Sequence, residues 1–260
     1  MSFTIMRSAS PGCEPNCPEW IVAEGQITAA TSGRFRKILK AMGKRKLPLI
    51  IRSPGGQVDP AIAMGRMIRK QGLDVAVAAA TYAGCKPADK TCKLPPEAKN
   101  MYTGQSASAG ANCSSACTLV LASGTRRLVG LFARAGVHDF SGTITKETVY
   151  YRETYRIIKG KKKVISRKVT GRKKTGSYTT SKLGKAFERK VAAYLKDMGM
   201  DATLLPLMRA TPASGIHYMT APELMNTKLA TGLVSAEVLT DPSLCRVSPP
   251  APNCVLQAAP

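Results

Sequence analysis

The sequence predicts an α/β protein, and three features of its first 80 residues predict this class. Residues 20–28 alternate apolar and polar side chains in the manner of a strand, and residues 31–43 carry apolar side chains at the spacing of one helix face. Residues 47–51 then form a short apolar run, which is typical of a strand buried in a parallel sheet. A strand, a helix and a second strand in succession indicate α/β architecture.

A glycine-rich turn follows this second strand, at residues 52–56 with the sequence RSPGG. Asp59 and Pro60 have the features of a helix start, and Gly72 is expected to end that helix. The remaining elements expected along the chain are a strand at 74–79, a loop at 81–109, an apolar helix after Ser115, strands at 126–129 and 135–138, helices at 181–198, 201–209 and from Thr220, and a last strand at 232–234.

Two adjacent serines, Ser114 and Ser115, lie in residues 111–124, ANCSSACTLVLASG, at the start of an apolar run expected to be a buried helix. Small residues on both sides permit a tight turn that holds a hydroxyl at a helix N-terminus, where backbone N–H groups favour negative charge. A nucleophile is presented in this way. A serine before an apolar helix is also a common N-cap, and the stretch alone leaves both interpretations open.

Two further features, the turn at residues 52–56 and His138, would supply groups that a nucleophilic serine needs. Glycines after a buried strand leave backbone N–H groups free and let a substrate carbonyl approach, because they have no side chain to block it. His138 ends the strand expected at 135–138 and has the side chain of a general base. Each feature alone is a weak signal, and their combination in this order is far more specific.

The eight cysteines fall into four short-range pairs, which favours local disulfides in an oxidising compartment. These pairs are Cys13 with Cys17, Cys85 with Cys92, Cys113 with Cys117, and Cys245 with Cys254. Cys113 and Cys117 lie around the serine, so pairing elsewhere or packing as small apolar residues also stays open for them. The two histidines, His138 and His217, are not spaced as zinc ligands, and we expect neither a metal nor a cofactor.

The compartment is predicted from these cysteines. The first 17 residues have no apolar segment of a signal peptide, and no apolar run reaches the roughly 20 residues that span a bilayer. The chain is therefore either cytosolic or preceded by a signal sequence upstream of the given start. The paired cysteines favour the second, a periplasmic or secreted protein.

The net charge of +23 is concentrated in one segment, because residues 145–190 carry sixteen Lys and Arg against three Glu. Tyr, Val, Ile and Thr over residues 148–158 and 164–169 favour a β-hairpin arm there. Such a segment fits an anionic surface or polymer, and it equally fits a solvated arm rich in lysine. We predict no specific nucleic acid as partner. The domain prediction is a cysteine-stapled extension at 1–18, one domain at 19–240 with a basic insertion at about 143–180, and a Pro- and Cys-rich tail at 241–260.

The chain resembles the proteolytic subunit of the Clp protease and its relatives in the ClpP/crotonase superfamily. The carriers of this resemblance are LIIRSPGGQVDPAIAMGRMIR at 49–69, CSSACTLVLASG at 113–124, AGVHDF at 135–140 and MTAPELMNTKLATGLVS at 219–235. The resemblance implies a spiral of repeated β-β-α units, a peptide or protein substrate and a homo-oligomer. It also implies a serine peptidase in which Ser115, selected over Ser114, is the nucleophile and His138 the base.

The resemblance places the oxyanion hole at Gly55 and Gly56, with the N–H of Ala116 as second donor. Clp-type enzymes carry an Asp a few residues before the helix start at Thr220, but residues 213–219 contain no carboxylate here. Ser214 or Asp139 are the candidates for orienting His138, and a Ser-His dyad is a further possibility. The alternatives are a degenerate relative that binds an anionic partner through its basic arm, and a crotonase-type protein holding an acyl-CoA thioester.

Overall fold

The protein is described by a computed structural model over residues 1–87, 89, 91–94, 101–181 and 183–256. Within the predictions above, parts of the 81–109 loop, one residue of the 181–198 helix and the last four residues of the tail lie outside these described residues. The predicted mixed α/β class is confirmed, because helices cover a sheet in which parallel pairs predominate. No helix in the described part of the chain has the length and apolarity needed to cross a membrane.

The central sheet has the strand order β5-β6-β1-β2-β3-β4-β8, with β13 paired to β2 at one end. Its members are β1 (Ser2–Ser8), β2 (Asn16–Glu24), β3 (Leu49–Arg52), β4 (Val75–Val77), β5 (Ala79–Tyr82), β6 (Met101–Ala107), β8 (Arg127–Val129) and β13 (Cys254–Leu256). The neighbours β2, β3, β4 and β8 are parallel, so the carboxyl ends of β3 and β4 lie at one edge of the sheet.

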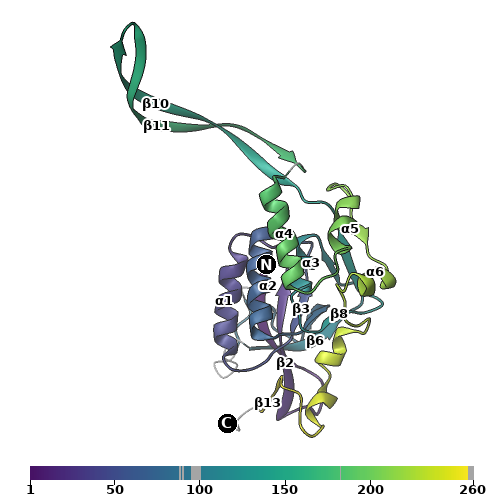
Figure 1. The fold of residues 1–260 in the computed structure, drawn as a ribbon. Helices are drawn as coiled ribbons and strands as arrows, with labels where there is room; N and C mark the ends of the chain where they lie inside the picture. The colour runs from purple at the N-terminus through teal and green to yellow at the C-terminus, as the bar shows by residue number, and fades with distance from the viewer. Residues whose placement is uncertain (88, 90, 95–100, 182, 257–260) are drawn as a thin grey trace.

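Both faces of this sheet are buried, which explains the continuous apolar runs of its strands. Ile51 and Val75 point to the larger core, which the helices cover, whereas Ile50 and Ala76 point to a smaller core around Trp20. The helices are α1 (Thr31–Met42), α2 (Val58–Gln71), α3 (Ala116–Leu121), α4 (Lys185–Asp197), α5 (Leu204–Ala210) and α6 (Ala221–Asn226), with short 3₁₀ helices η2 (Ala236–Leu239) and η3 (Pro242–Cys245). Figure 1 shows α1 and α2 side by side over the sheet.

Two helix boundaries follow the predicted chemistry. Gly72 ends α2 in the left-handed conformation, with φ of 63°. Thr220 caps α6 in a complete capping box with Glu223, whose pKa is lowered chiefly by the backbone N–H of Thr220. The start of α2 differs from expectation, because Gln57 occupies the N-cap and Asp59 lies in the first turn.

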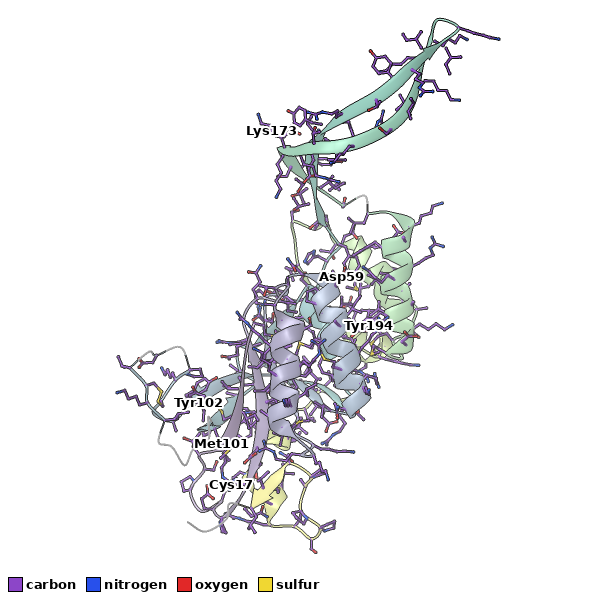
Figure 2. The ribbon with its side chains drawn as sticks, turned by 90° about the vertical axis from the view of Figure 1, so that its left-hand side faces the viewer. Cys17, Asp59, Met101, Tyr102, Lys173 and Tyr194 are labelled. Atoms are coloured by element: carbon purple, nitrogen blue, oxygen red, sulfur yellow. A yellow bond between two sulfur atoms is a disulfide. The ribbon has the colours of Figure 1, made fainter. Side chains whose placement is uncertain are left out.

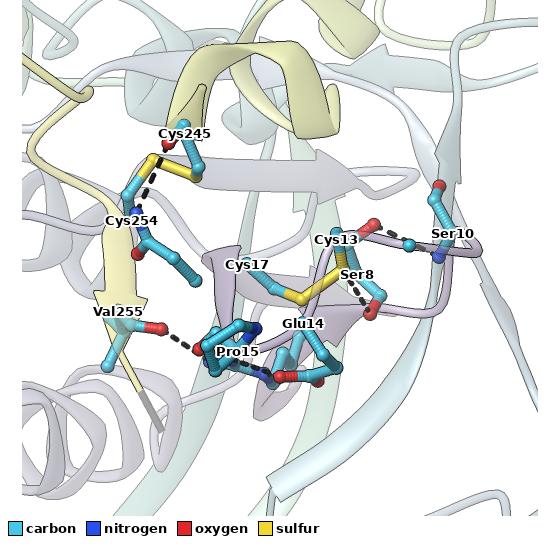
Figure 3. Close-up of a disulfide and its surroundings, with 12 residues drawn as sticks. Ser8, Ser10, Cys13, Glu14, Pro15, Cys17, Cys245, Cys254 and Val255 are labelled. Atoms are coloured by element: carbon cyan, nitrogen blue, oxygen red, sulfur yellow. Dashed lines mark hydrogen bonds and ion pairs between the residues drawn. A yellow bond between two sulfur atoms is a disulfide. The ribbon is translucent and has the colours of Figure 1, made fainter. Parts of the chain in front are cut away.

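The chain ends differ from the predicted extension and tail, because both are part of the sheet. Residues 2–8, expected in an extension, form β1 between β2 and β6, and residues 254–256 pair with β2. Arg7, only 2% exposed, contacts Glu14 and Glu19 and donates to the Val255 carbonyl. Figure 3 shows the disulfides Cys13–Cys17 and Cys245–Cys254 near each other at this end. The other expected pairs, Cys85–Cys92 and Cys113–Cys117, are also bonded.

The predicted 81–109 loop is wrong over part of its length, because residues 101–107 form β6 between β5 and β1. Its side chains are largely small and polar, so the strand depends on pairing with two neighbours rather than on an apolar pattern of its own. The strand predicted at 232–234 is reduced to one bridge between Gly232 and Leu128.

A long antiparallel hairpin projects from the body of the protein and directly precedes α4 in the sequence. It consists of β10 (Gly142–Ile158) and β11 (Lys161–Thr180), which pair with each other alone. Figure 1 shows this arm extending away from all other elements, and Figure 2 shows Lys173 on it, far from Asp59 and Tyr194 of the body.

A second sheet carries the candidate site and has the order β12-β9-β7. Its strands are β7 (Asn112–Ser114), β9 (Arg134–Val137) and β12 (His217–Tyr218), with β7 and β9 parallel. It joins the central sheet through a bridge between Ser53 and Cys113.

Tyr194 of α4 supports the helix that follows Ser115. It is fully buried, its hydroxyl donates to the Leu119 carbonyl at 2.7 Å, and Gly65 of α2 leaves the space that the ring occupies. Burial raises the pKa of this phenol far above its usual range.

We expect Tyr194→Phe to lower the free energy of unfolding by about 1 kcal/mol at pH 7, since it removes one buried hydrogen bond. A raised folded-state pKa gives stability that is present below the unfolded pKa of about 10 and is lost as the pH rises above it. The difference between the two proteins should therefore shrink at pH 11 in urea denaturation. Tyr155→Phe on the exposed arm is the matched control and should leave the free energy of unfolding unchanged at pH 7 and at pH 11. Equal losses of free energy for Tyr194→Phe at both pH values would contradict the expectation.

Candidate active site

Ser115 forms the turn between β7 and α3 in an unusual backbone conformation. Its φ of 58° and ψ of −130° lie in a region that residues with a side chain rarely adopt, and this costs on the order of 1–3 kcal/mol. It occupies the N-cap position, yet its side chain makes no capping hydrogen bond. Within the described residues its hydroxyl has no hydrogen-bond partner, so the simple N-cap interpretation of Ser115 is not supported.

Four contacts hold this turn in place. The Ser115 N–H donates to the Gly136 carbonyl at 2.8 Å, and the Ser114 N–H donates to the Ser53 carbonyl at 3.0 Å. The Thr118 hydroxyl donates to the Ser115 carbonyl at 2.7 Å. The Cys113–Cys117 disulfide spans the turn, with one cysteine two residues before Ser115 and one two residues after it. The strained conformation is thus fixed by both sheets and by a covalent bridge.

Ser114 differs sharply from its neighbour. It is buried, its hydroxyl oxygen has no hydrogen-bond partner, and it pairs in register with Gly136 of β9. A side chain at Gly136 would lie 3.2 Å from this oxygen and 2.6 Å from Ile216, so the glycine is what admits the close packing. The chain thus presents one serine at the turn and buries the other.

Gly55 lies directly against the Ser115 turn, where a side chain does not fit. It has φ of 97°, and a Cβ on it would lie 2.6 Å from Cβ of Ser115 and 3.0 Å from the Ala116 nitrogen. Gly56, with φ of 138°, packs against the Ile27 carbonyl, which a Cβ on Gly56 would meet. The RSPGG turn after β3 therefore brings its backbone to the start of α3.

The backbone N–H groups around this contact differ in their partners. The Gly55 N–H donates to the Ser53 hydroxyl at 3.1 Å. The Ile27 N–H donates to the Gly55 carbonyl and the Ile27 carbonyl accepts from the Gln57 N–H, so the N–H of Gly56, which lies between them, points away from Ile27. Among the described residues, the N–H groups of Gly56 and Ala116 have no acceptor. One free donor, the Ala116 N–H, thus directly follows Ser115, a second lies at Gly56 in the facing turn, and the Gly55 N–H is held by a hydroxyl.

His138 follows β9 at the same end of the small sheet as Ser115. Ser114 pairs in register with Gly136. Neighbouring strands lie roughly 5 Å apart and rise about 3.3 Å per residue, so the Cα atoms of Ser115 and His138 are expected to lie within about 10 Å of each other. A Cβ on Gly136 would point to the same face of this sheet as the Ser114 hydroxyl, and His138 lies one residue beyond the end of β9. The side chains of Ser115 and His138 share no hydrogen bond.

The Nδ1 atom of His138 lies 2.6 Å from the main-chain carbonyl oxygen of Asp139. A carbonyl oxygen only accepts hydrogen bonds, so Nδ1 carries a proton, and in the neutral ring this tautomer leaves the lone pair on Nε2. The Asp139 carboxylate is engaged elsewhere, since it accepts from the Phe140 N–H at 2.8 Å. Ser214 is exposed and has no contact with His138 among the described residues. The partner of Nδ1 is thus the main-chain carbonyl of Asp139, and not the side chain of Ser214 or Asp139 that the sequence analysis proposed.

The second histidine lies nearby but faces another direction. His217 of β12 pairs with Val137 of β9, so its side chain lies on the face opposite to that of the Gly136 position and the Ser114 hydroxyl. Its Nε2 lies 2.9 and 3.0 Å from the two carboxylate oxygens of Glu223. This pair connects β12 to α6 and was not predicted from the sequence.

A cavity of about 330 Å³ lies away from these residues, lined by Leu47, Pro48, Asp74, Arg126 and others. These residues precede or flank the amino ends of β3, β4 and β8, whereas the RSPGG turn follows the carboxyl end of β3. In α/β sheets the carboxyl ends of the strands are where ligands bind, so the Ser115 region is the better candidate.

Comparisons with known proteins give structural similarities alone. No family model and no curated protein match the chain. Among solved structures, the chain is similar to an asparagine-to-aspartate mutant of ClpP1 from Listeria monocytogenes, at 9% identity and a TM-score of 0.45 over 85% of this chain and 93% of that one. It is also similar to a serine-to-alanine mutant of the 1510-N membrane-bound stomatin-specific protease, at 13% identity and a TM-score of 0.45 over 86% of this chain and 82% of that one.

Proposed function

We propose that this chain is a serine peptidase that forms an acyl-enzyme on Ser115. The observation that carries the proposal is the backbone of Ser115, which is held in a strained strand-to-helix turn while its hydroxyl is left without a capping role. Such a strand-to-helix turn presents the nucleophilic serine in α/β-hydrolases. Strain of this kind persists only where surrounding contacts impose it, and both sheets and a disulfide do so here.

In the proposed reaction, Nε2 of His138 takes the proton of the Ser115 hydroxyl as its oxygen attacks the scissile carbonyl. The resulting oxyanion accepts hydrogen bonds from the Ala116 N–H and the Gly55–Gly56 turn. His138 then passes the proton to the leaving amine, and water hydrolyses the acyl-enzyme with His138 again as base. The Asp139 carbonyl acts as a positioning group, because it holds the imidazole in the tautomer that this sequence of steps requires.

The four disulfides support a place in an oxidising compartment, and we propose a periplasmic or secreted peptidase that assembles as a homo-oligomer. A second candidate is a non-catalytic binding protein. It is favoured by the exposed basic arm and by the lack, among the described residues, of a carboxylate at Nδ1 of His138.

Covalent labelling separates the two candidates. We expect an alkyl fluorophosphonate to modify the folded protein once per chain, with the adduct mapped to Ser115 by mass spectrometry. Ser115→Ala should abolish labelling. Ser114→Ala is the matched control and should keep it, because that hydroxyl is buried and makes no hydrogen bond. Absence of labelling in wild type, or an adduct that survives Ser115→Ala, would refute the peptidase proposal.

A further inference from the structure

The β10–β11 arm has two chemically different faces, which follow from its register. Side chains alternate along each strand, and three bulges in β11 preserve the pairing of like faces. One face carries both glutamates, and every ion pair of the arm lies on it: Glu153 with Lys162 and Arg167, and Glu147 with Arg172. This paired face also holds Tyr151 and Tyr155 beneath Arg167 and Lys162.

The opposite face, here called the cationic face, has seven basic residues and no acidic one. Its basic members are Lys146, Arg152, Arg156, Lys161, Lys163, Lys168 and Lys173. Two of its cross-strand pairs place like charges directly opposite each other: Arg152 with Lys168, and Arg156 with Lys163. Directly opposed like charges destabilise a hairpin. An anionic partner would attract both members of each pair and so offset the repulsion between them.

The end of the arm is aliphatic as well as basic. Around the two-residue turn Lys159-Gly160, four large aliphatic side chains are exposed. They are Ile157 at 67%, Ile158 at 49%, Val164 at 45% and Ile165 at 56%. Exposed Tyr155 lies directly opposite Val164, at the inner edge of this group, and exposed tyrosines follow further back at 150 and 151. The arm therefore has aliphatic side chains at its end, aromatic ones from Tyr155 back toward the body, and basic ones throughout.

This order of side chains matches the layers of a membrane surface. Aliphatic groups favour the acyl boundary, tyrosines favour the headgroup level, and Lys and Arg favour anionic phosphates. A linear polyanion would be bound by the cations and would leave the four aliphatic side chains in water. A second copy of the chain would present the same uncompensated charge. An isolated two-stranded hairpin is also marginally stable in water, so a surface that covers it would stabilise it.

We propose that the β10–β11 arm docks on anionic phospholipid membranes, with its aliphatic end in the interfacial layer and its cationic face on lipid phosphates. The arm begins four residues after His138, so docking tethers the candidate active site to the membrane. The proposal concerns the arm alone and does not depend on catalysis by Ser115.

Vesicle co-sedimentation of the full chain tests this proposal. We expect binding to phosphatidylcholine vesicles containing 30% phosphatidylglycerol, weak binding to pure phosphatidylcholine, and loss of binding at high salt. Lys163→Gln with Lys168→Gln should weaken binding about 30-fold, since each basic residue contributes about fivefold. Ile157→Ser with Ile165→Ser should weaken it at least about tenfold. The matched controls, Lys37→Gln with Lys40→Gln on exposed positions of α1 and Val238→Ser with Val247→Ser on the body, should bind as wild type does.

A second measurement detects insertion of the arm into the membrane directly. It does not use the Ile157→Ser with Ile165→Ser variant, in which an unfolded arm would also reduce binding. Trp20 is the one native tryptophan and is buried, so Ile157→Trp adds a single solvent-exposed reporter. Its emission should shift to the blue on addition of the anionic vesicles. The proposal is overturned if that emission does not move, if the α1 control loses as much affinity as the arm variant, or if dextran sulfate binds the chain while vesicles do not.

Discussion

Replacing His138 by alanine is expected to lower kcat/KM for peptide and activated ester substrates by about 10⁴- to 10⁶-fold. The loss is this large because the serine hydroxyl is a poor nucleophile without a base, and removal of either partner disables the pair. Labelling of His138→Ala by the fluorophosphonate should slow in parallel. Stopped-time assays with a fluorogenic peptide library and a p-nitrophenyl ester measure the effect, and the residual rate should equal that of Ser115→Ala.

Two variants test whether His138 is oriented by the main-chain carbonyl of Asp139 or by one of the two side chains proposed from the sequence. Asp139→Asn removes the charge but keeps an oxygen that accepts from the Phe140 N–H, and Ser214→Ala removes an exposed hydroxyl. Each should change kcat/KM by less than about threefold, because neither side chain contacts the His138 ring. A loss of 10³-fold or more in Asp139→Asn would show that the carboxylate orients His138 and would reject the carbonyl as the positioning group.

Gly55→Ala should lower kcat/KM by about 100- to 1000-fold, because the added side chain would push the RSPGG turn away from Ser115 and displace an oxyanion donor. The added Cβ would lie 2.6 Å from Cβ of Ser115 and 3.0 Å from the Ala116 nitrogen, so the two turns must separate. Because Gly55 also has a positive φ, the variant should unfold at a lower temperature. Thermal unfolding followed by circular dichroism, together with steady-state kinetics on the folded fraction, separates the two losses.

Gly33→Ala is the matched control for this substitution. Gly33 lies in α1 with no atom within 4 Å of the position that a Cβ would take. Alanine there should leave kcat/KM unchanged and raise the free energy of unfolding by roughly 0.5–1 kcal/mol. If Gly55→Ala kept full activity, the glycine turn would have no part in binding the oxyanion.

Local sequence signals predicted those parts of the fold that local chemistry determines. Gly72 ends α2 because glycine accepts the left-handed conformation, and Thr220 with Glu223 forms a capping box within four residues. The strands β1 and β6 were missed because neither is an evident strand by itself. Each is stabilised by pairing with distant segments, and β6 exposes polar side chains that are typical of a loop.

The candidate site divides in the same way. Ser115, His138 and the RSPGG turn could be proposed from residue types in a given order. The strained φ of Ser115, the burial of Ser114 and the contact of Gly55 with Cβ of Ser115 required three-dimensional positions, because segments about 60 residues apart in sequence create them. The partner of Nδ1 could not be predicted from residue types, since every residue has a main-chain carbonyl.

The carbonyl of Asp139 has a consequence for genetic analysis of this protein. Point mutation changes side chains and leaves the main chain in place, so no single substitution deletes the acceptor that fixes the His138 tautomer. For the proposed peptidase, we therefore expect a saturation screen for lost activity to identify two catalytic side chains, those of Ser115 and His138, and no third. The orientation of the base would also tolerate sequence drift at residue 139, as long as β9 keeps its hydrogen bonds and the Asp139 N–H its bond to the Thr211 carbonyl.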